Sequence, residues 1–361
     1  MDCQLCPELS LDDWGEGLKA QLQGRRYPVS GTFELTERCN LACVHCYINQ
    51  PAGNREAWAR ELTAPHIATI LDQIAEAGCL SLLLTGGEVL LRPDFPEIYR
   101  HAKQKGMLVT LFTNGTLLTP KMADFLAEWR PSAMEITLYG STRGTYERVT
   151  QVPGSHARCM QGIELALERR LPLQLKAVLM RENCHELEEM RALAARLGVG
   201  FRYDGVLWPR LDGGQQPCAQ RLSAQEVAAL DRDDPERLGE WQKASSRSRG
   251  FVRSERVYDC GAGSHGFHVD CSGQLSVCMM ARRPAYDLLR GSFRDGWEKF
   301  LEPLLLRKRR LDTRCRDCDV GVLCAQCPGW SQMVHGDDET PVEFVCELGR
   351  LRAAQMPLSN S

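Results

Sequence analysis

The sequence has no long apolar run and no strong excess of charge of either sign. Its 361 residues carry 44 basic and 47 acidic side chains, a formal net charge of -3. No apolar segment approaches the ~20 residues that span a bilayer, and the N-terminus lacks the basic and apolar regions of a signal peptide. We therefore expect a soluble, cytoplasmic protein that binds neither membranes nor nucleic acid in bulk.

Cysteine, in contrast, is abundant, with 17 residues. In a chain of this size with no signal peptide, clustered cysteines more often bind metal than form disulfides. Three lie close together at 39, 43 and 46, and eight lie between Cys260 and Cys346. A separate Cys3-x2-Cys6 pair has no further ligand nearby, so we expect a chance pair or a minor structural role.

The three close cysteines, Cys39, Cys43 and Cys46, have the spacing C-x3-C-x2-C and follow the β-prone run 31–36. Iron–sulfur clusters normally take four thiolates, so three leave one iron free for another ligand. The alternative is a zinc knuckle completed by His45 or by a distant residue. Zinc fingers usually present paired CxxC units, which favours the cluster.

A second motif follows about forty residues later, where a buried-strand pattern ends in Gly86, Gly87 and Glu88. Glycine suits a backbone that passes close to a ligand, because it has no side chain to clash. A carboxylate can pair with an ammonium group in a charge-assisted hydrogen bond. These three residues are therefore a candidate binding turn.

Strand-like and helix-like segments alternate from residue 31 to about 203. Apolar β-prone runs are predicted at 32–35, 81–84, 108–112, 134–138, 173–179 and 199–203. Amphipathic helices are predicted between them at 65–77, 96–105, 121–129, 156–169 and 185–197. Six β/α units predict a parallel sheet with right-handed crossovers, and in such barrels chemistry lies at the carboxyl ends of the strands.

The cysteine motif, the Gly-Gly-Glu turn and the β/α pattern together resemble the radical S-adenosylmethionine (radical SAM) superfamily. The resemblance implies an α/β fold, an open (β/α)6 partial TIM barrel. It also implies a 4Fe-4S cluster on Cys39, Cys43 and Cys46. S-adenosylmethionine would bind the fourth iron, with Gly86, Gly87 and Glu88 supporting its methionine amino group.

Three residues on or after the later strands are weaker candidates. By family position, Thr137 at the end of the fourth strand would contact the ribose of the cofactor. Arg148 resembles a family arginine near the cofactor carboxylate, and a solvated arginine at a helix start is the alternative. Lys176 lies on the fifth strand, where strand parity alone does not say whether it points into the cavity.

The C-terminal cysteines resemble the SPASM extension of peptide-modifying radical SAM enzymes, a small irregular domain with two auxiliary clusters. The run Cys315-x2-Cys318-x5-Cys324-x2-Cys327 departs from the family spacing by one residue in its last interval. By family topology one cluster is held by Cys315, Cys318, Cys324 and Cys346. The other is held by Cys260, Cys278 and Cys327, with Cys271 or an open iron in the fourth position. Two zinc ribbons are the alternative.

The resemblance implies reductive cleavage of S-adenosylmethionine to a 5′-deoxyadenosyl radical and oxidation of a substrate radical through the auxiliary clusters. We expect a maturase that crosslinks or oxidises a ribosomally made peptide. We also expect a separate leader-peptide recognition protein and a flavodoxin- or ferredoxin-like electron donor. Alternatives are modification of a protein side chain or a tetrapyrrole, and, in another class, a non-catalytic electron-transfer protein.

The expected division of the chain is an N-terminal extension over 1–30, a radical SAM core over 31–230, a linker over 231–259 and a SPASM domain over 260–361. Pro209, Pro217 and two adjacent glycines interrupt regular structure before the linker, which is typical of a domain boundary.

Overall fold

The computed structural model describes residues 24–48, 50–247, 254–316 and 318–355, together with positions 17, 21 and 22. Within these residues nine strands form one sheet in the order β11-β10-β9-β1-β4-β5-β6-β7-β8, and β2 and β3 form a small second sheet. Cys3 and Cys6 lie outside the described residues, so their predicted role stays a prediction.

Six neighbouring parallel strands confirm the predicted β/α pattern. They are β1 (Ser30–Glu34), β4 (Ser81–Thr85), β5 (Leu108–Thr113), β6 (Ala133–Thr137), β7 (Leu173–Val178) and β8 (Gly200–Asp204). Along β7 buried and partly exposed side chains alternate. Leu173, Leu175 and Ala177 belong to the buried core, so Gln174, Lys176 and Val178 face the other side of the sheet.

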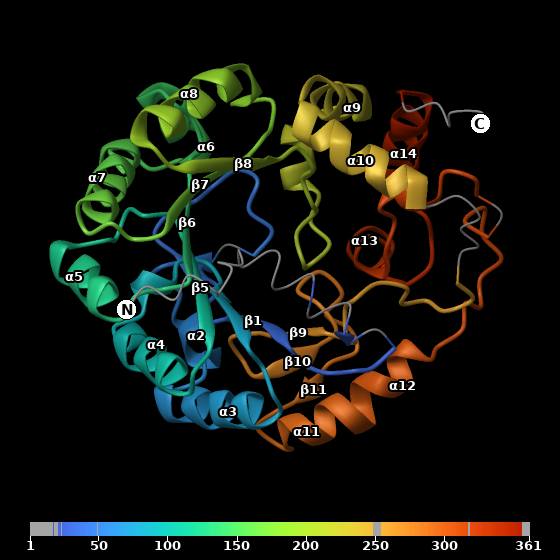
Figure 1. The fold of residues 1–361 in the computed structure, drawn as a ribbon, viewed down its shortest axis with the longest axis horizontal. Coiled ribbons are helices and arrows are strands. Elements are labelled where there is room, and N and C mark those ends of the chain that lie inside the picture. Colours follow the sequence, from blue (N-terminus) through green and yellow to red (C-terminus); the bar gives the residue numbers. More distant parts are fainter. Residues whose placement is uncertain are drawn as a thin grey trace, which may run out of the picture.

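Helices cover the outer face of these strands (Figure 1). They are α3 (Ala64–Glu76), α4 (Phe95–Gln104), α5 (Pro120–Glu128), α6 (Arg143–Thr150), α7 (Ser155–Glu168) and α8 (Leu187–Leu197). Local sequence sets their ends: Thr119 caps α5 by accepting the Met122 N–H, with Pro120 at the first helical position. Gly198 ends α8 at φ +70°, a conformation that glycine adopts without strain.

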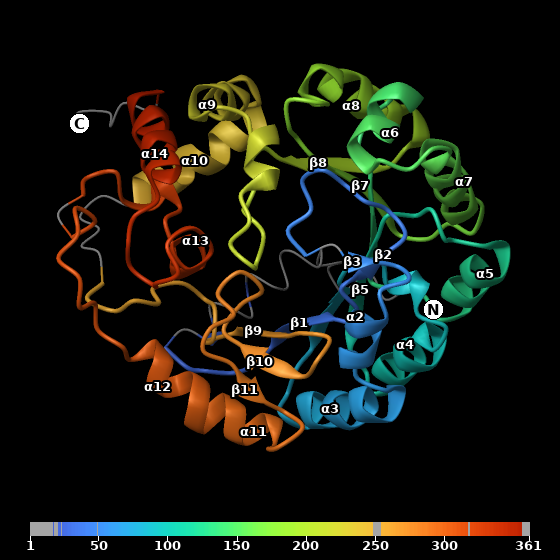
Figure 2. The ribbon, with the colours of Figure 1, turned by 180° about the vertical axis from the view of Figure 1, so that it is seen from behind.

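The C-terminal part continues the same sheet. β9 (Gly266–Val269) pairs in parallel with β1, and β10 (Gln274–Ser276) and β11 (Tyr286–Asp287) follow in antiparallel. Figure 2 shows this extension beside β1. The segment predicted as a SPASM domain is therefore joined to the barrel by backbone hydrogen bonds, a pairing that no local pattern predicts.

Part of the expected linker is helical: α10 (Pro235–Arg247) lies within it, and α9 (Ala224–Asp233) runs into it from the expected core. Asp231 is fully buried and accepts hydrogen bonds from Arg237 and Arg352. Buried carboxylates are stable when they are paired in this way, and the pairing packs α9 against α14 (Glu343–Gln355).

The remaining elements are short. They are β2 (Arg38–Cys39), β3 (Gln50–Pro51), α2 (Arg55–Arg60), α11 (Phe293–Asp295), a π-helical turn (Gly296–Leu301), α12 (Glu302–Leu305) and α13 (Pro328–Val334). The 3-10 turns are Val89–Leu91, Cys184–Glu186, Gln216–Gln220 and Gly321–Cys324. Among the described helices, none combines the length and the apolar character that crossing a membrane requires.

Candidate active site

One cavity of ≈ 400 Å³ opens where the barrel strands end. The carboxyl ends of parallel strands meet at one edge of a sheet, and the loops there bring the predicted residues together. The lining includes the three cysteines of the first motif, both glycines of the turn and one threonine at the end of β6: Cys39, Cys43, Cys46, Gly86, Gly87 and Thr137. Cys39 and Thr137, which lie more than ninety positions apart in the sequence, therefore line the same cavity.

Backbone hydrogen bonds hold the cysteine loop in place. Ala42 N–H donates to the Thr150 carbonyl and Val44 N–H to the Val149 carbonyl, both at 3.0 Å, which ties the loop to α6. Cys39 Sγ accepts from the Leu41 N–H at 3.4 Å and from Asn114 Nδ2 at 3.6 Å. Burial raises the pKa of Cys39 to about 12, so a positive charge is needed to make it a thiolate.

His45 lies between the second and third cysteines and packs against Tyr139, with ring centroids 5.2 Å apart. Burial lowers its pKa to about 4. Its Nδ1 is buried and finds no hydrogen-bond partner among the described residues. The His45 residue also lines the cavity, so the ring forms part of the wall between the second and third cysteines.

Gly86 and Gly87 are required by a close approach of two backbone segments. A Cβ on Gly86 would lie 2.2 Å from the Thr36 carbonyl oxygen, and one on Gly87 would lie 2.2 Å from that of Arg38. The N–H of Gly87 donates to Thr36 at 2.7 Å. Gly86 also has φ +142°, which side chains rarely allow. The glycines thus press the turn against the segment that leads into Cys39.

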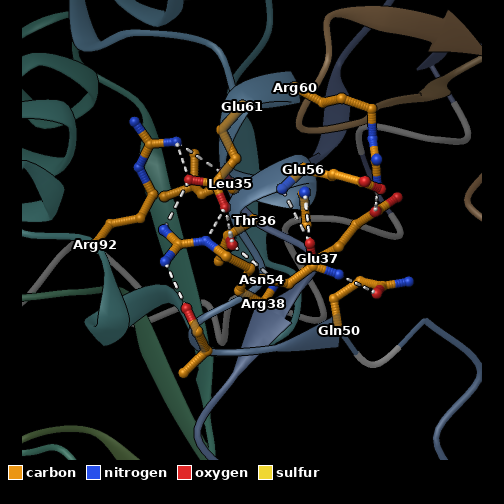
Figure 3. Close-up of polar contacts among 12 residues, drawn as sticks. Leu35, Thr36, Glu37, Arg38, Gln50, Asn54, Glu56, Arg60, Glu61 and Arg92 are labelled. Carbon is orange, nitrogen blue, oxygen red and sulfur yellow. Dashed lines mark hydrogen bonds and ion pairs between the residues drawn. The ribbon is translucent and has the colours of Figure 1, made fainter.

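A buried ion-pair network holds that segment from the other side (Figure 3). Glu61 accepts from Arg38 Nε at 2.7 Å and Nη2 at 3.0 Å, accepts from the Thr36 hydroxyl, and lies 3.6 Å from Arg92 Nη1. Arg92 also donates to the Leu35 carbonyl at 2.9 Å. Each of these three charged side chains is less than 10% exposed. We call Arg38, Glu61 and Arg92 the clamp.

Glu88 does not line the cavity. It is fully buried, and its carboxylate accepts from Thr113 Oγ1 at 2.6 Å, from Asn114 N–H at 2.7 Å and from Leu90 N–H at 3.1 Å. Burial raises its pKa, although the three hydrogen bonds oppose the change. The carboxylate therefore orders the end of β5, and through it Asn114, which contacts Cys39.

The other candidates differ in position. Thr137 is buried and lines the cavity, and so does Lys176, which points inward from β7. Arg148 is 55% exposed and lies outside the cavity wall, donating to Glu182 at 3.1 Å and to Thr145 Oγ1 at 3.0 Å. Its exposure matches the solvated alternative, although Arg148 lies in the last turn of α6 and not at a helix start.

A second group of cysteines surrounds a smaller cavity of ≈ 200 Å³ near the C-terminus. The lining cysteines are Cys315, Cys318, Cys324 and Cys346, the four that the sequence assigns to one site. Asp319, Val320, Arg314 and Arg350 also line this cavity, and both arginines pair with Glu343. Three cysteines from one short stretch and Cys346, 22 residues after Cys324, thus line one cavity.

Cys260, Cys278 and Cys327 form a third group. Burial raises the pKa of Cys327, and the neighbouring thiols of Cys278 and Cys260 raise it further. Cys278 accepts from the N–H groups of Met280 and Ala281, each at 3.3 Å. Cys271 is buried elsewhere, where burial and the carboxylates of Glu37, Asp270, Glu34 and Glu61 raise its pKa.

A buried carboxylate, Glu34 on β1, connects the first and third cysteine groups. Arg282, four residues after Cys278, donates to Glu34 at 2.8 and 2.6 Å, and Tyr47, next to Cys46, donates at 3.5 Å. Burial favours the neutral acid, but Arg282 and His268 outweigh it and lower the pKa of Glu34 to about 2. The carboxylate is therefore ionised and holds both loops.

Sequence reasoning missed the roles of Glu34 and of the residues after Cys278. Met279 and Met280 line the main cavity, so the C-terminal segment forms part of its wall. The run Thr113-Asn114-Gly115 is a faint signal in the sequence, because it follows a predicted strand, but the pattern does not predict the contact of Asn114 with Cys39. Glu34 could not be found from the sequence, because its partner Arg282 is 248 residues away.

The fold and the site define a β/α partial barrel with a three-cysteine loop at the mouth of a ligand cavity. Residues 33–194 match the model of the radical SAM superfamily. The chain is 32% identical over 273 residues to a PqqA peptide cyclase of Rhizobium meliloti, an alignment that covers 70% of this chain and 68% of that protein. The chain belongs to the radical SAM superfamily.

Two further similarities are informative. The chain is 28% identical over 339 residues to an AdoMet-dependent heme synthase of Methanosarcina barkeri, covering 84% of this chain and 92% of that protein. It resembles the crystal structure of Streptococcus suis SuiB bound to precursor peptide SuiA, with a TM-score of 0.64, 15% identity, and 91% and 78% of the two chains covered. Alignments with several other PqqA peptide cyclases span about half of those proteins.

Proposed function

We propose that this radical SAM enzyme oxidatively modifies a ribosomally made peptide, by crosslinking or oxidising its residues. The observation that carries the proposal is the single cavity that joins Cys39, Cys43 and Cys46 to the Gly-Gly turn and to Met279 and Met280 of the C-terminal segment. A cavity closed by the SPASM-like segment would bring the cofactor and the auxiliary cysteines to the same substrate.

The residues present fit a 4Fe-4S cluster with bound S-adenosylmethionine. Three thiols share the cavity and leave one iron position to the cofactor. The buried Nδ1 of His45 has no partner among the described residues, and Thr137 offers a hydroxyl for the ribose. When bound, the reduced cluster and its cofactor would supply a 5′-deoxyadenosyl radical. The chain's own part is to orient the cofactor and exclude water.

Glu88 then acts as a positioning residue for this cofactor. Its three hydrogen bonds fix Leu90, Thr113 and Asn114, and the adjacent Gly86 and Gly87 line the cavity. Support for the methionine amino group would come from the backbone of the turn that Glu88 holds, rather than from the buried carboxylate. Arg148 has no role in this arrangement.

Two auxiliary 4Fe-4S clusters would occupy the C-terminal cysteine groups, in a domain that begins near residue 260. The four cysteines Cys315, Cys318, Cys324 and Cys346 line one cavity, which supports an iron–sulfur cluster behind a radical SAM core. Zinc on the same four thiolates is the alternative that iron analysis tests.

The separation of Cys271 from Cys260, Cys278 and Cys327 supports an open iron in the inner auxiliary cluster. Peptide-modifying relatives and the peptide-bound SuiB structure support a peptide substrate. A separate leader-peptide recognition protein and a flavodoxin- or ferredoxin-like electron donor complete the proposed system.

A tetrapyrrole is the second candidate substrate. It is favoured by the alignment that covers 92% of an AdoMet-dependent heme synthase. Modification of a protein side chain is a third possibility. It would use the same chemistry, and the side chain would have to enter the same cavity. Incubation with peptides encoded near this gene and with tetrapyrroles, followed by mass spectrometry, separates the substrates.

The test of the mechanism is the division of labour between the clusters. In Cys278→Ala and Cys318→Ala, reductive cleavage to 5′-deoxyadenosine without substrate should persist, while the oxidised product is lost. Each variant must first be soluble and keep its barrel cluster, because losing a cluster can unfold a small domain. Full product from a variant that lacks either auxiliary cluster would reduce the C-terminal cysteines to a structural role.

A further inference from the structure

The inner wall of the barrel carries a buried cation that the site described above does not use. Lys176 on β7 lines the main cavity together with Phe112 on β5 and Asp204 on β8. Its register partners are Thr137 on β6 and Arg202 on β8. The side chain is only 15% exposed, so the ammonium is held in the wall.

The Lys176 ammonium has no carboxylate of its own among the described residues that contact it. Glu135 on β6 is already held by Arg202, which donates through Nη2 at 2.5 Å and through Nε at 3.3 Å. Lys176 Nζ lies 3.5 Å from the same carboxylate, beyond the 2.7–3.2 Å of an ordinary hydrogen bond. Two cations thus share one anion.

An aromatic ring covers another side of the ammonium. Lys176 Nζ lies 3.0 Å from the centroid of the Phe112 ring, a cation–π contact that orients the group but supplies no acceptor. Burial lowers the pKa of Lys176 to about 7, Arg202 lowers it as well, and Glu135 opposes both. An anion entering the cavity would supply the missing partner.

We propose that Lys176 forms a subsite for one carboxylate of the substrate, the side chain of an aspartate or glutamate in the modified peptide. This inference rests on the proposed function. The Glu135 carboxylate lies 3.5 Å from the ammonium, so a doubly charged phosphate is disfavoured and a single negative charge fits. Apolar side chains of the same cavity, Val178 and Met280 among them, suit the methylenes of an acidic residue.

The competing occupant is the carboxylate of S-adenosylmethionine itself. Labelling of the wild-type, anaerobically reconstituted protein separates the two, because a free amine reacts and a paired one is protected. Amines are methylated with isotope-labelled formaldehyde and a borane reductant, and mass spectrometry follows the peptide that contains Lys176. Exposed Lys121 on α5 is the internal control.

The probes are N-acetylglutamate N-methylamide and its neutral counterpart, N-acetylglutamine N-methylamide, each at millimolar concentration with saturating S-adenosylmethionine. The acidic probe should slow labelling of Lys176 by about fivefold or more, the neutral probe should not, and Lys121 should be unaffected. Equal protection by both probes, no protection by either, or full protection by S-adenosylmethionine alone would overturn the proposal.

A variant gives a second measurement. Lys176→Met keeps the length of the side chain and removes its charge, so S-adenosylmethionine affinity by equilibrium dialysis should stay near the wild-type value; a large loss would assign the ammonium to the cofactor and overturn the subsite. Neither measurement depends on turnover. Failure to form 5′-deoxyadenosine would refute the proposed function and leave the labelling result to be judged separately.

Discussion

At the scale of single residues, the proposed role of Glu88 is to hold the turn that supports the cofactor. Glu88→Gln replaces one acceptor oxygen by an NH2 group that faces the donors of Thr113 or Asn114. Losing one hydrogen bond to a buried charge costs about 1.5–3 kcal/mol. Because Glu88 acts on the cofactor only through the turn, this cost sets an upper limit on the loss of S-adenosylmethionine affinity, about tenfold to a hundredfold. Equilibrium dialysis measures this, and iron analysis should show the barrel cluster retained.

The matched control for that variant is Glu97→Gln, at an exposed position on α4, which should bind the cofactor like the wild type. Unchanged affinity of Glu88→Gln for S-adenosylmethionine would show that the Gly-Gly-Glu turn is not part of the cofactor site.

Glu34 predicts an acid-sensitive contact at the same scale. Its pKa is about 2 in the folded protein against an ordinary value of 4.5, so the unfolded chain binds more protons in between. The stabilisation is fully present above about pH 4.5 and is lost as the pH falls through about 2. Urea unfolding at several pH values should therefore show a shallower acid dependence for Glu34→Gln than for the wild type. Parallel curves would contradict this.

At the scale of elements, the clamp fixes the segment between β1 and the cysteine loop. Arg92→Met removes a buried cation from Glu61 and leaves the Leu35 carbonyl without its donor. Breaking a buried pair costs about 3–5 kcal/mol, which urea unfolding should reveal. Arg60→Met is the matched control, because Arg60 is 52% exposed in its pair with Glu37 (Figure 3) and such pairs contribute less than about 1 kcal/mol.

If Arg92→Met and Arg60→Met lowered the free energy of unfolding by the same amount, the buried clamp would contribute no more to stability than an exposed ion pair. The barrel strands themselves do not depend on it, since their ladders run from β1 to β8 without passing through residues 36–38.

At the scale of the whole molecule, three cysteine groups predict three clusters. Reconstituted protein should hold about twelve irons, four for each cluster. The triple change Cys39→Ala, Cys43→Ala, Cys46→Ala should leave about eight. Iron and sulfide analysis with absorption spectroscopy measures both, and a zinc-filled preparation without charge-transfer absorption would refute the assignment.

The sequence by itself determined the parts of this protein that depend on local order. Helix and strand periods, and glycines at helix ends, predict the six barrel strands and five of their helices, though not α6, within a few residues of those observed, because neighbouring residues decide those patterns. The spacing of Cys39, Cys43 and Cys46 predicts their shared loop for the same reason.

Only the tertiary structure decided what depends on partners distant in the chain. The fold buries the Glu88 side chain away from the cavity and points the Lys176 side chain into it. It pairs Glu34 with Arg282, 248 positions away. It also joined β9 to β1, so that the C-terminal segment closes the site. Strand register and burial set these contacts, and neither is encoded in a short stretch of sequence.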